Sequence, residues 1–304
     1  MSGVGEHDIR RRHHSLGKMK STPRLQTNLL QYDEIPHWQK DNEHLLSGYR
    51  PTSNSWRVSM ESILEWHNET VNINSHVGGA IIFALLPAHF YYTIYNHVET
   101  AQPTDLLVFL VYFAGVSICF VCSALCHVIW NHSPSVASMG NRLDFVGIVL
   151  LMWGASIASI HFAFICSNRL RNVHWILLSS SAIGCITFTL FPQFAGPKFR
   201  AARATMYASL GLFAIVFVTH SIILYGYDVQ KKRLALSWMI AMAAAKAGAA
   251  FYASRFPEIK YPYRFDLVGA SHQLFHCLVF VAGLAHYAGL IQAFREVRSL
   301  YATC

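Results

Sequence analysis

Seven long apolar stretches, separated by short polar loops, dominate the sequence. They cover about residues 77–97, 105–130, 144–166, 174–192, 204–225, 234–254 and 268–291. Each is close to the ~20 residues that a helix needs to cross ~30 Å of hydrocarbon. Only 13% of the residues are charged, about half the usual share in soluble domains. The sequence therefore predicts an all-α integral membrane protein with a seven-transmembrane helix bundle, and it excludes a soluble globular enzyme.

The remaining residues flank this bundle. The predicted parts are a disordered basic cytosolic tail over 1–28, a cytosolic pre-membrane segment over 29–76, the transmembrane domain over 77–291 and a short C-terminal tail over 292–304. The tail is polar and has little to bury. In the pre-membrane segment, apolar residues recur at roughly helical spacing. This pattern predicts a short interfacial helix over Trp56–Thr70.

The charge pattern limits both partners and orientation. The net charge of +8 comes from tail and loop Lys and Arg, which suits a neighbour of anionic lipid headgroups. No nucleic-acid partner is expected, because no basic patch interleaved with aromatic residues and no phosphate-binding glycine loop is present. Basic loop residues are equally numerous on the two sides of the spans, so only the basic tail favours a cytosolic N-terminus.

Polar side chains gather where the second span ends and where the third and seventh begin, all on one side of the membrane. Ser123 and His127 are four residues apart and share a helix face, as do His272 and His276. Asp144 opens the third span. The two pairs lie at similar depth, which predicts a site of three imidazoles with a fourth position open, typical of catalytic zinc. Imidazole ligands disfavour Mg²⁺ and Ca²⁺.

Each of these residues also has a purely structural interpretation. A lone buried histidine is more often a hydrogen-bonded packing residue than a ligand. Asp144 could be a carboxylate favoured by a helix dipole, and Ser123 could bond back to a helical carbonyl. Cys119, Cys122 and Cys126 resemble a zinc motif, but they fall inside a helix and are interpreted as packing residues.

Two other membrane-protein classes fit less well. A G-protein-coupled receptor would carry Asn-Pro-x-x-Tyr in the seventh span and an acidic-Arg-Tyr motif at the end of the third, and both are missing. A zinc transporter would need polar residues spaced through the membrane on several helices, whereas the candidate ligands lie at one depth.

Several motifs together resemble the progestin and adipoQ receptor family, also called the hemolysin III family. They are Glu69-Thr-Val-Asn-Ile-Asn-Ser-His76, Ser123-x-x-x-His127, Asp144 and Ser271-His-Gln-x-x-His276. Asp41-Asn42 and Gly48-Tyr49-Arg50 are similar to the family's cytosolic segment. The resemblance covers about residues 32–291, and the tail and Asn74 look like fungal members.

The resemblance implies a cytosolic N-terminus and a zinc ion held by His127, His272 and His276. It further implies that Asp144 reaches the metal through water and that Ser123 lies beside it. The adiponectin-receptor branch has ceramidase activity linked to this site, and fungal relatives act in zinc, sterol and lipid homeostasis.

The leading hypothesis is a zinc-dependent intramembrane amidohydrolase acting on a ceramide-like lipid. Asp144 would serve as general base and Ser123 would steady the oxyanion or the water. The alternative is a non-catalytic receptor or sensor with a structural zinc. The expected partners are membrane lipids such as ceramide or a fatty-acid-like ligand, with an extracellular protein ligand left open, and the expected location is the plasma membrane or the endoplasmic reticulum. The sequons at Asn68 and Asn131 lie on the N-terminal side, so a cytosolic N-terminus predicts no glycan at either.

Overall fold

The computed structural model describes residues 29–194, 199–245 and 248–300, and the elements in these ranges are helical. The long helices are α2 (Thr70–Thr93), α3 (Pro103–Ile129), α4 (Pro134–Ala163), α5 (Asn168–Leu190), α6 (Arg200–Tyr225) and α10 (Ser271–Leu300). The shorter helices are α1 (Trp56–Glu61), α7 (Tyr227–Arg233), α8 (Leu236–Ala245) and α9 (Gly248–Ser254). Short 3-10 turns cover His37–Gln39, Ser62–Leu64, Tyr95–His97 and Pro192–Phe194. The predicted tail over 1–28 and residues 301–304 lie outside the described residues.

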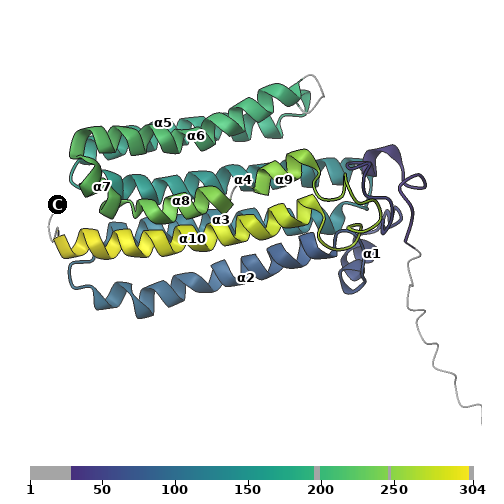
Figure 1. The fold of residues 1–304 in the computed structure, drawn as a ribbon, viewed down its shortest axis with the longest axis horizontal. Coiled ribbons are helices and arrows are strands. Elements are labelled where there is room, and N and C mark those ends of the chain that lie inside the picture. The colour runs from purple at the N-terminus through teal and green to yellow at the C-terminus, as the bar shows by residue number, and fades with distance from the viewer. Residues whose placement is uncertain (1–28, 195–198, 246–247, 301–304) are drawn as a thin grey trace, which may run out of the picture.

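Seven helical stretches are long and apolar enough to cross a membrane, so the predicted architecture is confirmed. The sixth stretch, Leu236–Ser254, consists of α8 and α9 in succession. In Figure 1 the long helices lie side by side along the long axis, with α5 and α6 paired at one edge. Large apolar side chains such as Ile176, Ile183 and Ile223 remain exposed on the outside. Such apolar surface is suited to lipid contact.

The largest differences between the helix ends and the predicted segments are three. α4 begins at Pro134 rather than at residue 144. Pro suits the first position of a helix, and the hydropathy pattern missed the first turns because they are polar. Asp144 therefore lies in the third turn of α4 instead of opening it. α10 continues to Leu300, so most of the predicted C-terminal tail is helical. The predicted surface helix is shorter than expected, since α1 ends at Glu61 and Thr70 already begins α2.

α3 and α4 touch backbone to backbone because glycines occupy the contact points. A Cβ atom on Gly115 would lie 2.5 Å from the carbonyl oxygen of Leu150, and one on Gly154 would lie 2.8 Å from that of Val111. Real side chains do not approach a backbone this closely, so these positions require glycine. This approach fixes the spacing between the α3 and α4 residues of the site described below.

A buried ion-pair network ties three helices together at the end of the bundle where α3 begins. The guanidinium of Arg298 donates two hydrogen bonds to the carboxylate of Asp105, of 2.7 Å and 2.8 Å, and His161 Nε2 lies 2.8 Å from the same carboxylate. The backbone N–H of Gln102 donates a further bond to it. Asp105 and His161 are fully buried. We call this group the Asp105 clamp, and it joins α3, α4 and α10.

At the opposite end, the pre-membrane segment folds against the bundle where α3 ends and α10 begins (Figure 1). It closes on itself through an antiparallel bridge between Leu30 and Tyr49. It is tied to the α9–α10 loop by hydrogen bonds from Asn42 to Glu258 (2.9 Å) and from Ser47 to Asp266 (2.6 Å). The segment therefore covers the end of the bundle that holds the predicted histidines.

Candidate metal centre

The three predicted histidines meet in one group. His127 lies in the last turn of α3, and His272 and His276 lie in the first two turns of α10. One ring nitrogen from each lies within 4.8 Å of the others. Nε2 of His127 is buried and has no hydrogen-bond partner among the described residues. A buried imidazole nitrogen without a partner is costly, so the group is suited to hold a metal ion.

A carboxylate that the sequence did not single out as a site residue orients His127. Glu69, just before α2, has its Oε2 atom 2.7 Å from Nδ1 of His127 and accepts a 2.7 Å hydrogen bond from Asn72. Burial alone would raise the pKa of Glu69, but its hydrogen bonds with His127 and Asn72 outweigh burial and hold the pKa below its ordinary value. With Nδ1 donating to Glu69, Nε2 carries the lone pair that a metal needs, as in known carboxylate–histidine–metal triads.

The other two ligands are also oriented by their surroundings. Nδ1 of His276 lies 3.3 Å from the backbone oxygen of Asn72, which leaves Nε2 for an ion. The ring of His272 packs edge-on against Tyr252 of α9, with centroids 5.0 Å apart. His76 of α2 stacks on His276 at 3.8 Å, and neither of its buried nitrogens has a hydrogen-bond partner in the described part of the chain. Glu69 and His76 are the two ends of the motif quoted above, which was the only sequence signal for them.

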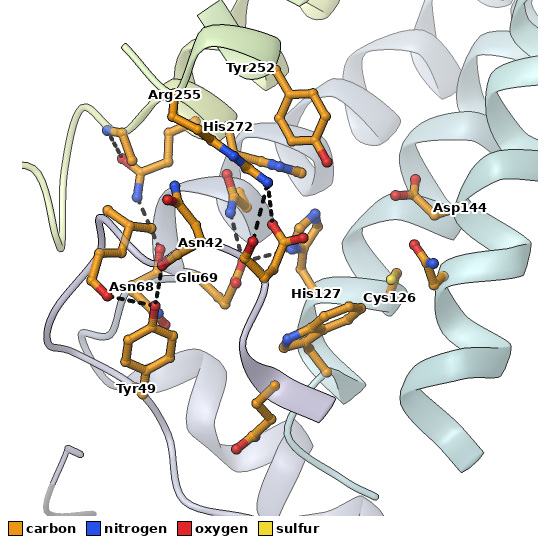
Figure 2. A pocket seen from close by; sticks show the side chains of 18 residues that line it. Asn42, Tyr49, Asn68, Glu69, Cys126, His127, Asp144, Tyr252, Arg255 and His272 are labelled. Carbon is orange, nitrogen blue, oxygen red and sulfur yellow. Dashed lines mark hydrogen bonds and ion pairs between the residues drawn. The ribbon is translucent and has the colours of Figure 1, made fainter. Parts of the chain in front are cut away.

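The predicted acid–base residues lie beside the histidines. Ser123 is buried on α3 one turn before His127. Asp144 of α4 interacts with both Ser123 and His127. Asp144, His127 and His272 line one cavity, and Figure 2 shows Asp144 entering it from the side opposite His272. The structure thus brings all five predicted site residues to one place.

Much of the wall of this cavity is polar and buried. Asn42 and Gln39 of the pre-membrane segment, Asn68 and Gln273 contribute to it. Arg255 also lines the cavity (Figure 2), and its Nη2 lies 3.3 Å from the carboxylate of Asp41. Cys126 also lines the cavity, but no cysteine belongs to the metal-binding group.

The remaining membrane histidines have other partners, as their lack of ligand spacing predicts. His89 lies 3.1 Å from the hydroxyl of Tyr287, His161 belongs to the Asp105 clamp, and His286 lies 3.2 Å from the carbonyl oxygen of Ala155. His174 and His220 pair with each other between α5 and α6 at 2.9 Å. None of these residues joins the three-histidine group.

Seven membrane-crossing helices with a buried three-histidine group at one end define a class of polytopic membrane proteins with a candidate intramembrane metal centre. Within this class, the chain belongs to the haemolysin-III related family, whose sequence model matches residues 64–287. The family predicted from the motifs is therefore confirmed, and the chain is an adiponectin-receptor-like membrane protein.

Curated relatives come from animals, fungi and plants. The chain is 33% identical to the adiponectin receptor protein of Drosophila melanogaster over 274 residues, covering 90% of this chain and 61% of the relative. It is 32% identical to progestin and adipoQ receptor-like protein 1 of Caenorhabditis elegans, covering 90% and 63%. It is 30% identical to the ADIPOR-like receptor IZH2 of Saccharomyces cerevisiae, covering 88% and 85%. The chain thus spans less than two thirds of the length of the first two relatives.

Proposed function

We propose that the protein is a zinc-dependent intramembrane amidohydrolase that cleaves a ceramide-like lipid and acts in lipid and metal homeostasis. The observation that carries this proposal is the placement of Asp144 in one cavity with His127 and His272, two members of the three-histidine group. Three nitrogen donors with a fourth position open are typical of catalytic rather than structural zinc. The relatives' names as receptors are compatible with a signalling role for such an activity.

The donor set suits zinc. The three candidate ligands are imidazoles, which favour zinc over Mg²⁺ or Ca²⁺. Glu69 supplies the outer carboxylate that fixes the ring of His127. When bound, zinc lowers the pKa of water at its open position and polarises a carbonyl oxygen.

The protein's own residues would handle the proton and the substrate. Asp144 would take a proton from water beside the histidines and give it to the leaving amine. Ser123, which interacts with Asp144, would hold the ionised carboxylate in place with its single O–H donor. Once Asp144 has taken the proton, the freed hydroxyl would donate to the negative charge on the carbonyl oxygen. Because the centre lies between membrane helices, a lipid amide can reach it with its acyl chain still in apolar surroundings.

Asp144→Ala tests the catalytic role. We expect at least a hundredfold lower release of fatty acid from ceramide, since a positioned acid–base group contributes 10²–10⁴-fold. Zinc content and thermal stability should stay near wild type, because Asp144 is not one of the candidate ligands. The measurement is fatty-acid release by purified, zinc-loaded protein in lipid nanodiscs. Wild-type protein that contains zinc yet releases no more fatty acid than the variant would exclude the hydrolase.

One observation favours the alternative of a non-catalytic receptor or sensor. Near the histidines, α3 and α10 meet through imidazole rings, with the centroids of His127 and His276 4.8 Å apart, so an ion shared by His127 and the α10 histidines would act as a structural bridge at this end. In that case zinc removal would lower stability strongly, and Asp144→Ala would leave every function of the protein unchanged.

We further propose that the N-terminus is cytosolic. Absence of glycan does not test this orientation, because the sequon residues Asn68 and Asn131 are 6% and 3% exposed, and the folded protein has no room for a glycan at either position, whichever way it is inserted. With seven spans, the two termini lie on opposite sides. In sealed vesicles with the cytosolic face outward, we expect protease to remove an N-terminal tag and to spare a C-terminal tag. The reverse pattern would invert the topology.

A further inference from the structure

The Gly48-Tyr49-Arg50 motif has no place in the proposed chemistry, yet the structure buries its arginine beside the metal centre. Arg50 is 3% exposed, and its side chain reaches from the pre-membrane segment to the end of α3. Its Nη2 donates to the backbone oxygen of His127 at 2.6 Å, and its Nη1 donates to that of Val128 at 3.0 Å and to Ser62 Oγ at 2.7 Å.

These contacts complete the end of α3. The last four carbonyl groups of a helix lack partners within the helix. In α3, the carbonyl of Ile129 accepts from the backbone N–H of His132 at 2.9 Å, and Arg50 supplies donors for His127 and Val128. A buried carbonyl without a donor is costly, so the last turn, which carries His127, depends on this guanidinium.

Arg50 also acts on the group that orients the His127 ring. It interacts electrostatically with Glu69, whose carboxylate bonds to Nδ1 of His127. Burial lowers the pKa of Arg50 to about 10, so the guanidinium remains charged at neutral pH. Arg50 thus binds the backbone of His127 directly and acts on its ring through Glu69.

The pre-membrane segment reaches the other ligand-bearing helix as well. Glu258, buried in the α9–α10 loop, accepts from the backbone N–H of Ser271 at 2.8 Å and from the Ser271 hydroxyl. Asn42 donates to the same carboxylate. Ser271 is the first residue of α10 and directly precedes His272.

We propose that Arg50 is a positioning residue for the metal centre, which fixes His127 by binding the carbonyl groups at the end of α3. This inference rests on the proposed metal site, but not on the hydrolase activity. A planar fork of donors is required, because two neighbouring carbonyls and a hydroxyl are bound at once. Lysine keeps the charge but lacks the fork.

The test compares Arg50→Lys with Arg298→Lys in full-length protein purified in detergent. Arg298 is also buried and bonded through a fork, but it lies at the other end of the bundle. Co²⁺ binding to metal-free protein gives the dissociation constant, and the visible spectrum of bound Co²⁺ reports its coordination geometry. For Arg50→Lys we expect at least a tenfold weaker affinity, in the range known for groups that orient metal ligands, and an altered spectrum. For Arg298→Lys we expect both to match wild type.

Equal Co²⁺ affinity in wild type and Arg50→Lys would overturn the proposal, and so would equal losses in the two variants. If Arg50→Lys does not fold, Ser62→Ala removes one acceptor of Arg50 and keeps the charge. An affinity lowered about threefold would then support the proposal, and an unchanged affinity would overturn it. Wild-type protein that binds no Co²⁺ would overturn the metal site as well as this role.

Discussion

We expect His272→Ala/His276→Ala protein to purify without the metal ion that wild-type protein carries. The double change removes two of the three imidazoles whose nitrogens lie within 4.8 Å of one another, and His127 alone cannot hold the ion. Metal analysis of both proteins measures the loss directly. Stability gives a second readout, because an ion at about 1,000 times its dissociation constant stabilises the native state by about 4 kcal/mol. Chelator should therefore lower the unfolding temperature of wild type but not of the variant.

The matched control is His174→Ala/His220→Ala. This change also removes a contacting pair of membrane histidines, but between α5 and α6, away from the metal-binding group. It should keep the full metal content and the response to chelator. A metal content that falls equally in both double variants, or in neither, would contradict the three-histidine centre.

We expect Asp105→Ala to be among the most destabilising single substitutions, at about 3–5 kcal/mol, because it leaves buried charge without its partner. Arg298 would lose two hydrogen bonds, His161 one, and the first turn of α3 its cap from Asp105 to the backbone of Gln102. Reversible unfolding in mixed micelles measures the free energy of unfolding. Bound metal should be retained in the folded fraction, since the clamp lies at the far end of α3 and α10.

Two further variants test whether the loss of stability comes from buried charge left without its partner. Asp41→Asn breaks an ion pair with Arg255 whose carboxylate side chain is 52% exposed, and such pairs contribute about 0–1 kcal/mol. Asp105→Leu/Arg298→Met replaces the buried charges by apolar side chains and should recover much of the stability that Asp105→Ala loses. A loss below about 1 kcal/mol for Asp105→Ala would mean that the clamp does not hold the helices together.

Hydropathy predicted the spans, and helical spacing predicted that the three histidines form one group, because hydropathy and spacing are both local properties of the sequence. His272 and His276, like Ser123 and His127, are neighbours on one helix face, and four-residue spacing expresses that directly. The start of α4 was predicted too late because hydropathy detects only apolar residues. The first turns of α4 are polar, and the Ser133-Pro134 pair at its start carries no hydropathy signal.

The contacts that organise the site join residues far apart in the chain. Glu69 and His127 are 58 positions apart, and Asp105 and Arg298 are 193 positions apart. No periodicity within a helix encodes such a pair, because it depends on how helices pack. The backbone contact at Gly115 and Gly154 likewise depends on the facing helix. A single sequence therefore indicates which residue types carry the chemistry, but not the groups that hold them.

α3 and α10 contact each other at both ends and in the middle. α10 carries its histidines at one tip and Arg298 at the other, which at 1.5 Å per residue are about 39 Å apart. Between them, the hydroxyl of Tyr112 on α3 donates a 2.6 Å hydrogen bond to the carbonyl of Gly283. Together with the bonds between Arg298 and Asp105, this bond attaches α10 to α3 at two levels. The axis of α10, and with it the depth at which its histidines sit, is therefore set by contacts outside the metal centre.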